Sequence, residues 1–561
     1  MTSDADRAFA GYAAATLDGL LEREPEWATS VGDHRHDDRL TVGTAAYYQE
    51  ASRWAGERLA GLAGIDAGRL SPQYQVDAQI LANQLTRLVF MIDELREHEW
   101  NPMVANPGRA IYNLLARDFA PLADRLRCAA RRLAMLPESL AAARAVLGAM
   151  PEIHIETALT QFAGTERLLT GELTRRAAEV EGAEVELSAV LPQALEALAE
   201  HARWLEERLA DGRRDGFRDP RLDADLFARK LRLVVVTERP VEQILARAVA
   251  DLARMTEELA VAAAELIGSE GSPARDNADV VRAALDSLAA DAPDDTTILG
   301  FVRAAYGAQR DFVTAHDLVT VFDDPLEVIP MPEIDRGVAV AYCDSPGPLE
   351  TAALPTFIAV SPTPEGWTQE RVRSFYREYN RHMVHNIMVH EAMPGHALQL
   401  QHSRRFTGGT QVRAAWRSGS FVEGWAVYAE QVMNAHGYPG EGNPAALRTQ
   451  RLKGKLRTII NAIMDTRVHC LGMTEAEAMA LMTGAGYQED GEAAGKWRRV
   501  LLTSTQLSTY YVGFLEVDGL AADLRREHPG WPERRLHDAM LAHASPPARH
   551  LRTLLDARAP G

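Results

Sequence analysis

The sequence contains little cysteine and no long apolar run. Its three cysteines, Cys128, Cys343 and Cys470, are widely spaced and form no CxxC pair, which argues against a thiolate metal site and agrees with a reducing compartment. No segment is long and apolar enough to span a bilayer. The opening residues also lack the basic start and continuous apolar core of a signal peptide. We therefore expect a soluble, cytoplasmic protein.

Positive charge is also scarce. The chain has 60 lysines and arginines against 79 aspartates and glutamates, a formal net charge of -19. This excess of negative charge disfavours nucleic acid or an anionic membrane as the main partner. It identifies neither a substrate nor an oligomeric state.

At 561 residues the chain exceeds the usual limit of about 250 to 300 residues for one hydrophobic core. We expect a helical N-terminal region over 1–270 and a second region over 271–561 that carries the functional motifs, intimately packed. Apolar residues recur at helical spacing along much of the chain. They predict long antiparallel helices over 124–150, 156–180, 186–209 and 240–267. A polar loop is expected at 267–277.

Two short segments interrupt the helical pattern. Residues 337–342, GVAVAY, and 355–361, PTFIAVS, are apolar, rich in β-branched residues and flanked by proline and glycine, which is typical of strands. They predict a small β-sheet whose edge strand lines a substrate cleft, where an extended peptide can add by backbone hydrogen bonds. A purely structural hairpin is the alternative.

The segment 390–399, HEAMPGHALQ, places two imidazoles and a carboxylate within seven residues. In the common zinc motif HExxH the histidines are four residues apart, about 40° around a helix, and both reach one ion. Here His396 follows His390 by six residues, about 240° around an unbroken helix. Pro394 disfavours helical geometry before it, and Gly395 tolerates most backbone angles. We predict a helix break that returns His396 to His390; a chance His-Glu pair and a simple helix end are the alternative.

A third metal ligand is predicted at Glu423, 27 residues after His396 in the segment FVEGWAVYAE. Many zinc hydrolases take a glutamate from the next long helix and leave one position open for water. The apolar residues of this segment predict a buried helix, yet Glu423 and Glu430 share another side of it. A buried carboxylate needs a cation or a ligand imidazole as its partner. We predict Glu430 behind such an imidazole; solvent exposure or pairing with arginine is the alternative.

Four segments carry a family resemblance: LEREPEWATSVGDHRHDDRL, HEAMPGHALQ, EGWAVYAE and TQLSTYYVG. They resemble the bacterial family known as domain of unknown function 885, whose HExxPGH motif is grouped with the zincin-like metallopeptidases. The resemblance implies a mainly α, two-lobed, cleft-containing fold similar to the oligopeptidases and carboxypeptidase Taq. It also implies that His390, His396 and Glu423 are metal ligands and that Glu391 is the general base.

The chemistry of such a site is hydrolytic. A metal held by two imidazoles and a carboxylate lowers the pKa of its bound water towards about 7 and polarises a carbonyl oxygen. Glu391 is adjacent to a ligand in the sequence and cannot easily be one too. It is placed to accept the proton of the water and to pass it to the leaving amine.

Tyr510 is the candidate donor to the oxyanion, since zinc hydrolases of this shape often use a tyrosine from a distant helix. Gln506, Tyr510 and Gly513 match the QxxxYxxG pattern of the family, which favours Tyr510 over Tyr511. A core or interface tyrosine is the alternative. Gln506 and Tyr511 are kept as candidates for supporting the site or binding substrate.

A further segment resembling the family contains Arg457, Asp465 and His469. These residues could bind substrate or brace the site, but a buried structural histidine is equally compatible with the pattern. His537 has the same two interpretations.

The sequence therefore predicts a zinc-dependent hydrolase of amide bonds, most simply a metallopeptidase acting on short peptides with one Zn²⁺ per chain. Two histidines and one glutamate can also hold Fe²⁺ for oxygen chemistry. Glu391 favours the hydrolase, because an iron oxygenase needs no base beside the metal. A catalytically inactive helical binding protein is the third alternative.

Overall fold

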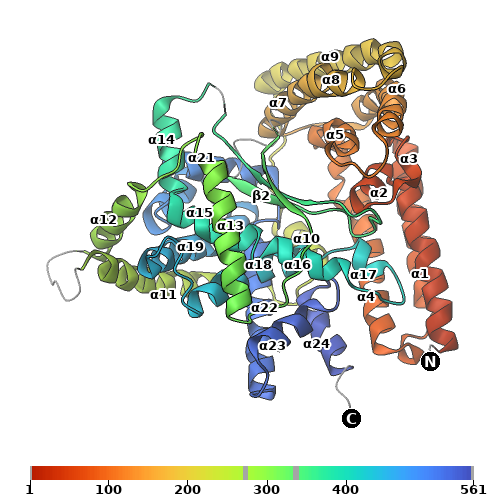
Figure 1. Ribbon diagram of the computed structural model, residues 1–561. Helices are drawn as coiled ribbons and strands as arrows, with labels where there is room; N and C mark the ends of the chain where they lie inside the picture. The colour runs from red at the N-terminus through yellow and green to blue at the C-terminus, as the bar shows by residue number, and fades with distance from the viewer. Residues whose placement is uncertain (1–2, 269–275, 333–339, 365, 558–561) are drawn as a thin grey trace. The chain divides into compact units, whose positions relative to one another are not determined.

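The computed structural model describes residues 3–268, 276–332, 340–364 and 366–557, and the chain divides into two compact units (Figure 1). The first unit is formed by Met1–Pro220, Pro346–Leu354 and Gly408–Ala415. The second is formed by Arg221–Ser345, Pro355–Thr407 and Trp416–Gly561. The chain thus leaves the second unit twice and returns to it.

The first unit consists of helices; those of residues 1–220 are coloured red to yellow in Figure 1. They are α1 (Asp4–Arg23), α2 (Pro25–Val31), α3 (Ala45–Ala63), α4 (Pro72–Phe90), α5 (Gly108–Ala116), α6 (Leu122–Val146), α7 (Glu152–Leu168), α8 (Thr174–Ala177) and α9 (Ala183–Asp215), with α17 (Val412–Ala415) from the later segment. Shorter helical turns lie between them at His34–His36, Ala67–Arg69, Met91–Leu95, Glu97–Glu99, Pro102–Ala105 and Leu169–Leu173.

Amphipathic helices form the core of this unit, as the sequence predicts. Helix α9 packs along α6 and α7, and their apolar faces bury Leu133, Leu140, Phe162 and Leu198. The predicted helix 156–180 is divided into α7, a π-helical turn and α8. Burial of these faces removes apolar surface from water, which contributes about 25 cal/mol per Å².

The later segments are tied to the first unit by buried contacts. The Arg413 Nε donates to Asp77 Oδ1 at 2.6 Å, and both side chains are fully buried. Asp77 also accepts a hydrogen bond from Thr410. Gly347 lies so close to the backbone of Val31 that a Cβ there would be 2.3 Å from its carbonyl carbon. These contacts hold both excursions of the chain in place.

The second unit contains most of the remaining helices and one small sheet. The helices are α10 (Ala224–Val234), α11 (Val241–Ile267), α12 (Asn277–Ala289), α13 (Ile298–Ala315), α14 (Gln369–Glu378), α15 (Arg381–Glu391), α16 (His396–Arg404), α18 (Gly419–Ala435), α19 (Pro444–Leu471), α20 (Glu475–Ala480), α21 (Asp490–Leu502), α22 (Ser508–Glu527), α23 (Glu533–Leu541) and α24 (Ala548–Asp556). A π-helical turn, Leu481–Ala485, follows α20.

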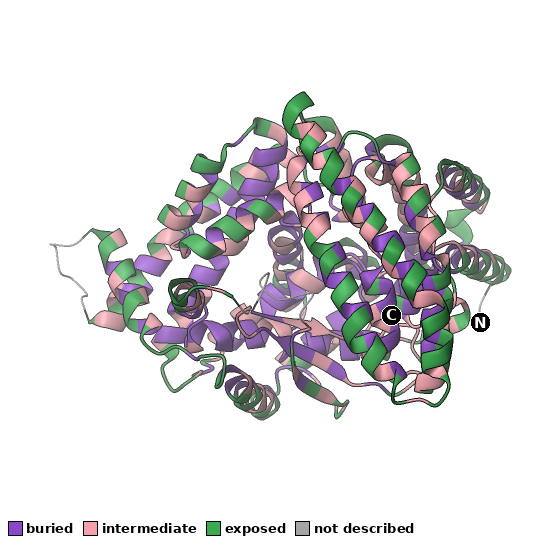
Figure 2. Ribbon diagram, turned by 90° about the horizontal axis from the view of Figure 1, so that it is seen from above, coloured by how far each residue is buried: buried purple, intermediate pink, exposed green. Residues whose placement is uncertain are grey.

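Helix α19 lies at the centre of this unit, with α11, α15 and α22 packed against it. Asn443 caps its first turn by accepting a hydrogen bond from the Ala446 backbone, and Gly472 ends it with φ of 69°. The packing of α11 on α19 places 221–267 in the second unit, whereas the sequence analysis put the division at residue 270. Figure 2 shows the buried residues on the inward faces of the helices.

The sheet has three strands in the order β1-β3-β2. Strand β1 (Leu326–Pro330) runs parallel to β3 (Thr356–Val360), and β2 (Ala341–Asp344) runs antiparallel to it. The predicted strand at 355–361 is β3, and the end of the one at 337–342 is the start of β2; residues 337–339 lie outside the described part of the chain. The sequence analysis did not predict β1.

The fold is thus mainly helical with a small sheet before the histidine motif, which confirms that part of the prediction. Helix 240–267 corresponds to α11, and most of the polar loop expected at 267–277 is not described. Of the helices that the structure describes, none is both long enough and apolar enough to cross a bilayer.

Candidate metal centre

The helix that carries His390 breaks directly after it, as the sequence predicts. Helix α15 ends at Glu391 and α16 begins at His396, with a cis peptide bond between Met393 and Pro394. At Gly395 a Cβ would lie 1.9 Å from the carbonyl oxygen of His390, so a side chain cannot be accommodated there. The turn brings the two imidazole rings to 4.7 Å between centroids, at 83° to each other.

A buried hydrogen bond fastens this turn to the helix that carries Glu423. The Trp425 Nε1 on α18 donates to the carbonyl oxygen of Pro394 at 2.8 Å. Trp425 itself is fully buried. The turn and α18 therefore hold a fixed position relative to each other.

Glu423 is equidistant from the two imidazoles. Its Oε2 lies 3.3 Å from His390 Nε2 and 3.4 Å from His396 Nε2. Ligand atoms about 2.1 Å from a tetrahedral zinc ion are about 3.4 Å from one another, longer than the usual charged hydrogen bond of about 2.8 Å. The two distances from Glu423 Oε2 therefore match the spacing between ligands of one zinc ion, and imidazole nitrogens and a carboxylate oxygen are zinc ligands by their chemistry.

Glu391 could also reach this group, since one of its oxygens lies within 4.8 Å of a nitrogen of each of the two histidines. However, its Oε2 accepts a hydrogen bond of 2.9 Å from the backbone N–H of Cys343 on β2. That bond orients the carboxylate beside the three donors. Glu423, whose two distances match those between zinc ligands and which has no such backbone bond, is our candidate for the third ligand, and Glu391 is then available for proton transfer.

Glu430 lies behind His390, as the sequence predicts. Its Oε1 is 2.8 Å from His390 Nδ1, and its Oε2 accepts a 2.7 Å hydrogen bond from Asn386. A carboxylate in this position fixes the tautomer in which the other ring nitrogen, Nε2, can bind a metal. The Nδ1 of His396 has no hydrogen-bond partner among the described residues.

The charged groups of the centre perturb one another strongly. Burial disfavours the charged imidazolium of His390, but hydrogen bonds to Glu423 and Glu430 outweigh it and raise its pKa well above the usual range. Burial also opposes ionisation of Glu423, yet the two imidazoles lower the pKa of this carboxyl far below its usual value. Burial raises the pKa of Glu391, which is the direction expected for a proton acceptor that must later donate.

Tyr510 lies next to this group from α22. Its ring is 6.4 Å from that of His390 and nearly parallel to it. The Arg499 Nη2 donates to the Tyr510 hydroxyl at 3.3 Å and to Gln506 Oε1 at 2.9 Å. Burial and the nearby charge of Glu423 raise the pKa of Tyr510, so its hydroxyl keeps its proton and can donate. Gln506 thus supports Tyr510 through Arg499.

Two glycines let the helix of Tyr510 approach the helix of Glu423. A Cβ at Gly424 would lie 2.3 Å from the backbone of Gly513, and one at Gly513 would lie 1.9 Å from the carbonyl oxygen of Ser420. Because neither residue has a side chain, the backbones of α18 and α22 pack directly together. This contact sets the distance between Glu423 and Tyr510.

Three of the other predicted residues brace the fold and do not line the site. Asp465 accepts hydrogen bonds from the backbone N–H groups of Thr505 and Ser508, at the start of α22. The Nδ1 of His469 accepts a hydrogen bond from the backbone N–H of Leu222, and its Nε2 donates to the carbonyl oxygen of Thr503. Tyr511 donates to Asp251 at 2.7 Å. These contacts favour the bracing role that the sequence left open.

His537 is also structural. Its ring nitrogens contact the Tyr428 hydroxyl and the carbonyl oxygen of Leu318 at 2.9 and 2.6 Å. Burial lowers its pKa to about 4. This histidine is therefore neutral near pH 7 and part of the core.

The candidate metal centre opens into a cavity of about 460 Å³, a size suited to a small ligand. Arg457 lines it, as do backbone and side-chain atoms of Ala341–Cys343 on β2. The sequence analysis missed several polar side chains of its wall: Tyr379, Asn386, Asn461, Glu492, Lys496 and Arg499. Glu492, Lys496 and Arg499 are spaced by four and three residues, so the sequence predicts that they share one face of a helix. It does not predict which other element that face packs against.

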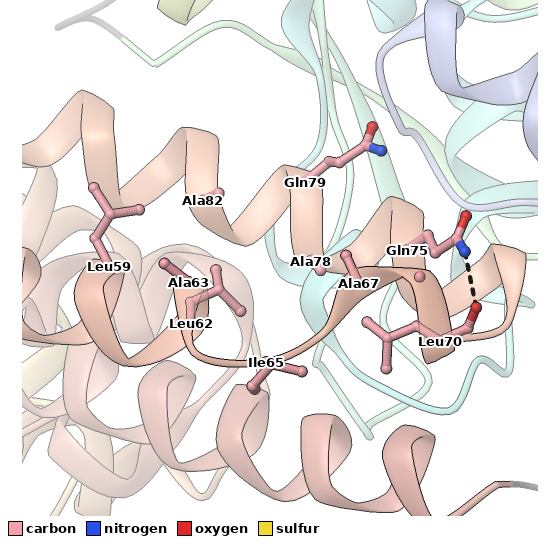
Figure 3. Close-up of a pocket in the computed structure, with 11 residues that line it drawn as sticks. Leu59, Leu62, Ala63, Ile65, Ala67, Leu70, Gln75, Ala78, Gln79 and Ala82 are labelled. Atoms are coloured by element: carbon pink, nitrogen blue, oxygen red, sulfur yellow. Dashed lines mark hydrogen bonds between the residues drawn. The ribbon is translucent and has the colours of Figure 1, made fainter.

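A cavity of about 570 Å³ in the first unit has a different character (Figure 3). Leucine, isoleucine and alanine side chains of α3, α4 and the segment between them form most of its wall, and Gln75 donates to the carbonyl oxygen of Leu70. No ionisable or metal-ligating side chain lines it. Although this cavity is larger than the one at the candidate metal centre, it has no side chain suited to catalysis, so the candidate metal centre is the better functional site.

Fold and site together define a mainly helical protein with a candidate His-His-Glu metal centre beside a small sheet. The chain belongs to the family described as bacterial protein of unknown function (DUF885), whose model matches residues 25–555. No curated protein matches the chain.

Two solved structures are similar to the whole chain. One is a proposed lipoprotein of unknown function from Shewanella oneidensis, 27% identical, with a TM-score of 0.82 over 98% of this chain and 99% of that one. The other is a proposed lipoprotein from Colwellia psychrerythraea, 15% identical, with a TM-score of 0.79 over all of both chains. The second likeness concerns the fold alone.

Proposed function

We propose that the protein is a zinc-dependent hydrolase of amide bonds that acts on short peptides. The observation that carries this proposal is the convergence of His390 Nε2, His396 Nε2 and Glu423 Oε2 at 3.3 and 3.4 Å, with the Glu391 carboxylate beside them. Three donors at this spacing match a zinc ion with one open position, which is the arrangement of catalytic rather than structural zinc sites.

Each residue has a separate role in the proposed reaction. When bound, zinc supplies Lewis acidity for acidifying a water molecule and polarising a carbonyl group. Glu391 accepts the proton of the attacking water and donates it to the leaving nitrogen. Its orientation comes from the hydrogen bond of the Cys343 backbone. Tyr510 donates its hydroxyl proton in a hydrogen bond to the developing oxyanion.

The same three ligands could hold Fe²⁺, and the arrangement of Glu391 and Tyr510 favours hydrolysis over oxygen chemistry. An oxygenase needs neither a base nor an oxyanion donor at the metal. An inactive binding protein needs no oriented carboxylate either. We further propose that the helical fold belongs to the zincin-like metallopeptidases, on the strength of the HExxPGH motif and the buried glutamate helix.

The test combines metal analysis with digestion of a peptide library. We expect about one zinc per chain, lost in His390→Ala and Glu423→Ala. Glu391→Gln should keep the zinc and lose turnover, because only the proton acceptor is removed. Tightly bound iron without zinc-supported cleavage would favour the oxygenase instead.

The cytoplasmic location also stays a proposal. Both similar structures are of proposed lipoproteins, so their location differs from the one we expect here. Cell fractionation with an antibody to this protein separates the alternatives. Recovery in the membrane or exported fraction would contradict a cytoplasmic enzyme.

A further inference from the structure

One wall of the cavity carries a row of charged side chains from a single helix. Glu492, Lys496 and Arg499 follow one another on α21 at spacings of four and three residues, so they share one helix face. All three line the cavity, together with Arg457 from α19. None of them belongs to the proposed set of metal ligands.

The positive charges in this wall outnumber the negative ones. Lys496 Nζ and Arg457 Nη1 lie 3.6 and 3.9 Å from the same oxygen of Glu492, beyond hydrogen-bonding distance. The other oxygen of Glu492 accepts a 2.8 Å hydrogen bond from the Tyr379 hydroxyl. The hydrogen-bond partners of Arg499 are the neutral Gln506 and Tyr510. Three cations thus share one carboxylate.

With a divalent ion bound, the side chains that line the cavity have a net positive charge. The other carboxylates that line it, Glu391, Glu423 and Glu430, contact the two imidazoles or the backbone of β2. With a divalent ion added to the three cations, the positive charges exceed the four carboxylates by one. A substrate carrying one negative charge would neutralise this excess.

The charged wall of the cavity, formed by Glu492, Lys496, Arg499 and Arg457, is also largely shielded from water. The side chains of Lys496 and Glu492 are only 11% and 15% exposed. Burial lowers the pKa of Lys496 to about 8 although Glu492 raises it, so the ammonium lacks part of the stabilisation that water would give it. A ligand carboxylate in contact with it would restore that stabilisation.

A buried amide adds a polar group without a partner. Asn461 on α19 lines the cavity and is 6% exposed. Its Oδ1 is buried and has no hydrogen-bond partner among the described residues. Because leaving a buried amide without hydrogen bonds costs about 1 to 3 kcal/mol, this side chain is suited to binding a polar ligand.

We propose that Lys496 and Arg457 bind a carboxylate of the substrate and that Asn461 Oδ1 accepts a hydrogen bond from an N–H group of the same molecule. The proposal rests on the proposed hydrolase function, since it names the substrate class of that cavity. The substrate is then a short peptide or N-acyl amino acid with a carboxylate near the scissile amide. Arg499 is assigned to positioning Tyr510 and not to binding the carboxylate.

Binding to a protein that cannot turn over tests the proposal separately from catalysis. The probes are N-acetylated tetrapeptide mixtures with neutral side chains, as free acids and as carboxamides, and a third mixture of carboxamides with one glutamate. Dissociation constants are measured by calorimetry on zinc-loaded Glu391→Gln protein. We expect the free acids to bind about 10-fold or more tighter than the neutral carboxamides. If the glutamate carboxamides also bind about 10-fold tighter than the neutral carboxamides, the site accepts the carboxylate of a side chain as well as that of the C-terminus.

The matched variants are Lys496→Gln and Arg498→Gln, each in the Glu391→Gln background. Both remove one positive charge from α21, but Arg498 is exposed and does not line the cavity. We expect the preference for a carboxylate to fall below about 3-fold in the first variant and to persist in the second. A parallel loss in both would indicate a long-range effect of net charge and overturn the proposal.

Two outcomes separate this inference from the proposed function. Equal affinity for acids and carboxamides, or binding of neither, would overturn the carboxylate site even if the wild-type protein cleaves peptides. A carboxylate preference that depends on Lys496, with no cleavage of any mixture by the zinc-loaded wild-type protein, would support the site and contradict the hydrolase.

Discussion

Replacing Gly513 by alanine should force α18 and α22 apart and move Tyr510 away from the candidate metal centre. The added Cβ would lie 1.9 Å from the carbonyl oxygen of Ser420, whereas ordinary contact begins at 3.4 Å. The helices must therefore separate by about 1.5 Å, because a backbone oxygen cannot rotate away as a side chain can. Overpacking of a well-packed core costs typically 1 to 3 kcal/mol, and this contact lies at the severe end.

The expected loss of stability is about 3 kcal/mol, or roughly 4 °C in the unfolding temperature of a unit of roughly 300 residues. A separation above 1 Å also misplaces Tyr510 relative to Glu423, and such an error can lower kcat by about 10²-fold. Zinc content should stay near that of the wild type, because His390, His396 and Glu423 do not lie on α22.

Gly519→Ala is the matched control on the same helix. Gly519 is exposed, and a Cβ there would meet nothing within 4 Å. Alanine should stabilise the helix by about 0.5 to 1 kcal/mol through its higher helix propensity. Differential scanning calorimetry and steady-state kinetics follow both variants. An unfolding temperature of Gly513→Ala at or above that of the wild type, with unchanged turnover, would refute the close packing of α18 and α22.

Three further changes test other contacts. Tyr510→Phe should lower kcat by about 10²-fold with little change in KM, since only a transition-state hydrogen bond is lost; equal kinetics would remove Tyr510 from the mechanism. Trp425→Phe leaves the buried carbonyl of Pro394 without its donor and should cost about 1 to 3 kcal/mol in urea unfolding; an unchanged midpoint would contradict that contact. Burial lowers the pKa of His201 to about 4, and neither ring nitrogen has a hydrogen bond among the described residues. Below pH 6.5 the unfolded chain binds a proton that the folded one does not take up until about pH 4, so His201 costs stability as the pH falls. His201→Leu should therefore gain about 2 kcal/mol more at pH 5 than at pH 8; equal gains would show that this histidine is not responsible.

The local parts of the structure could be predicted from the sequence. Long amphipathic stretches predict α6, α9 and α11, because a helix's buried face repeats within a few residues. The convergence of His390 and His396 also follows locally, from Pro394 and Gly395. Glu423 could be predicted because it lies on the next long helix.

The parts that depend on distant packing could not be predicted. Strand β1 is five residues long and contains Glu327 and Pro330, so its pattern is weak without its partner β3. The hydrogen bond that orients Glu391 comes from a strand backbone 48 residues earlier. Because almost every residue has a backbone N–H, the residue type does not reveal this donor. To predict the wall formed by Glu492, Lys496, Arg499 and Arg457, one must know that α21 packs against α19.

The roles of Asp465 and His469 show the same limit. Both are polar residues in a segment that resembles the family, which is compatible with catalysis or with structure. Only their contacts decide: Asp465 is bound by backbone N–H groups at the start of α22, and His469 contacts backbone atoms at the end of α21. A buried polar residue is therefore a site candidate only when part of its bonding capacity remains open, as it does in Asn461.

The two excursions of the chain, Pro346–Leu354 and Gly408–Ala415, have a consequence for how such proteins can be engineered and can diverge. No single cut separates the units, so a fragment beginning at residue 221 would carry both excursions without their packing partners and would expose Arg413 without Asp77. Recombination that exchanges residues 1–220 as one cassette would break the same contacts. Residues 1–220 are thus expected to be inherited together with the rest of the chain, and truncation libraries should yield little folded protein when the cut lies near residue 220.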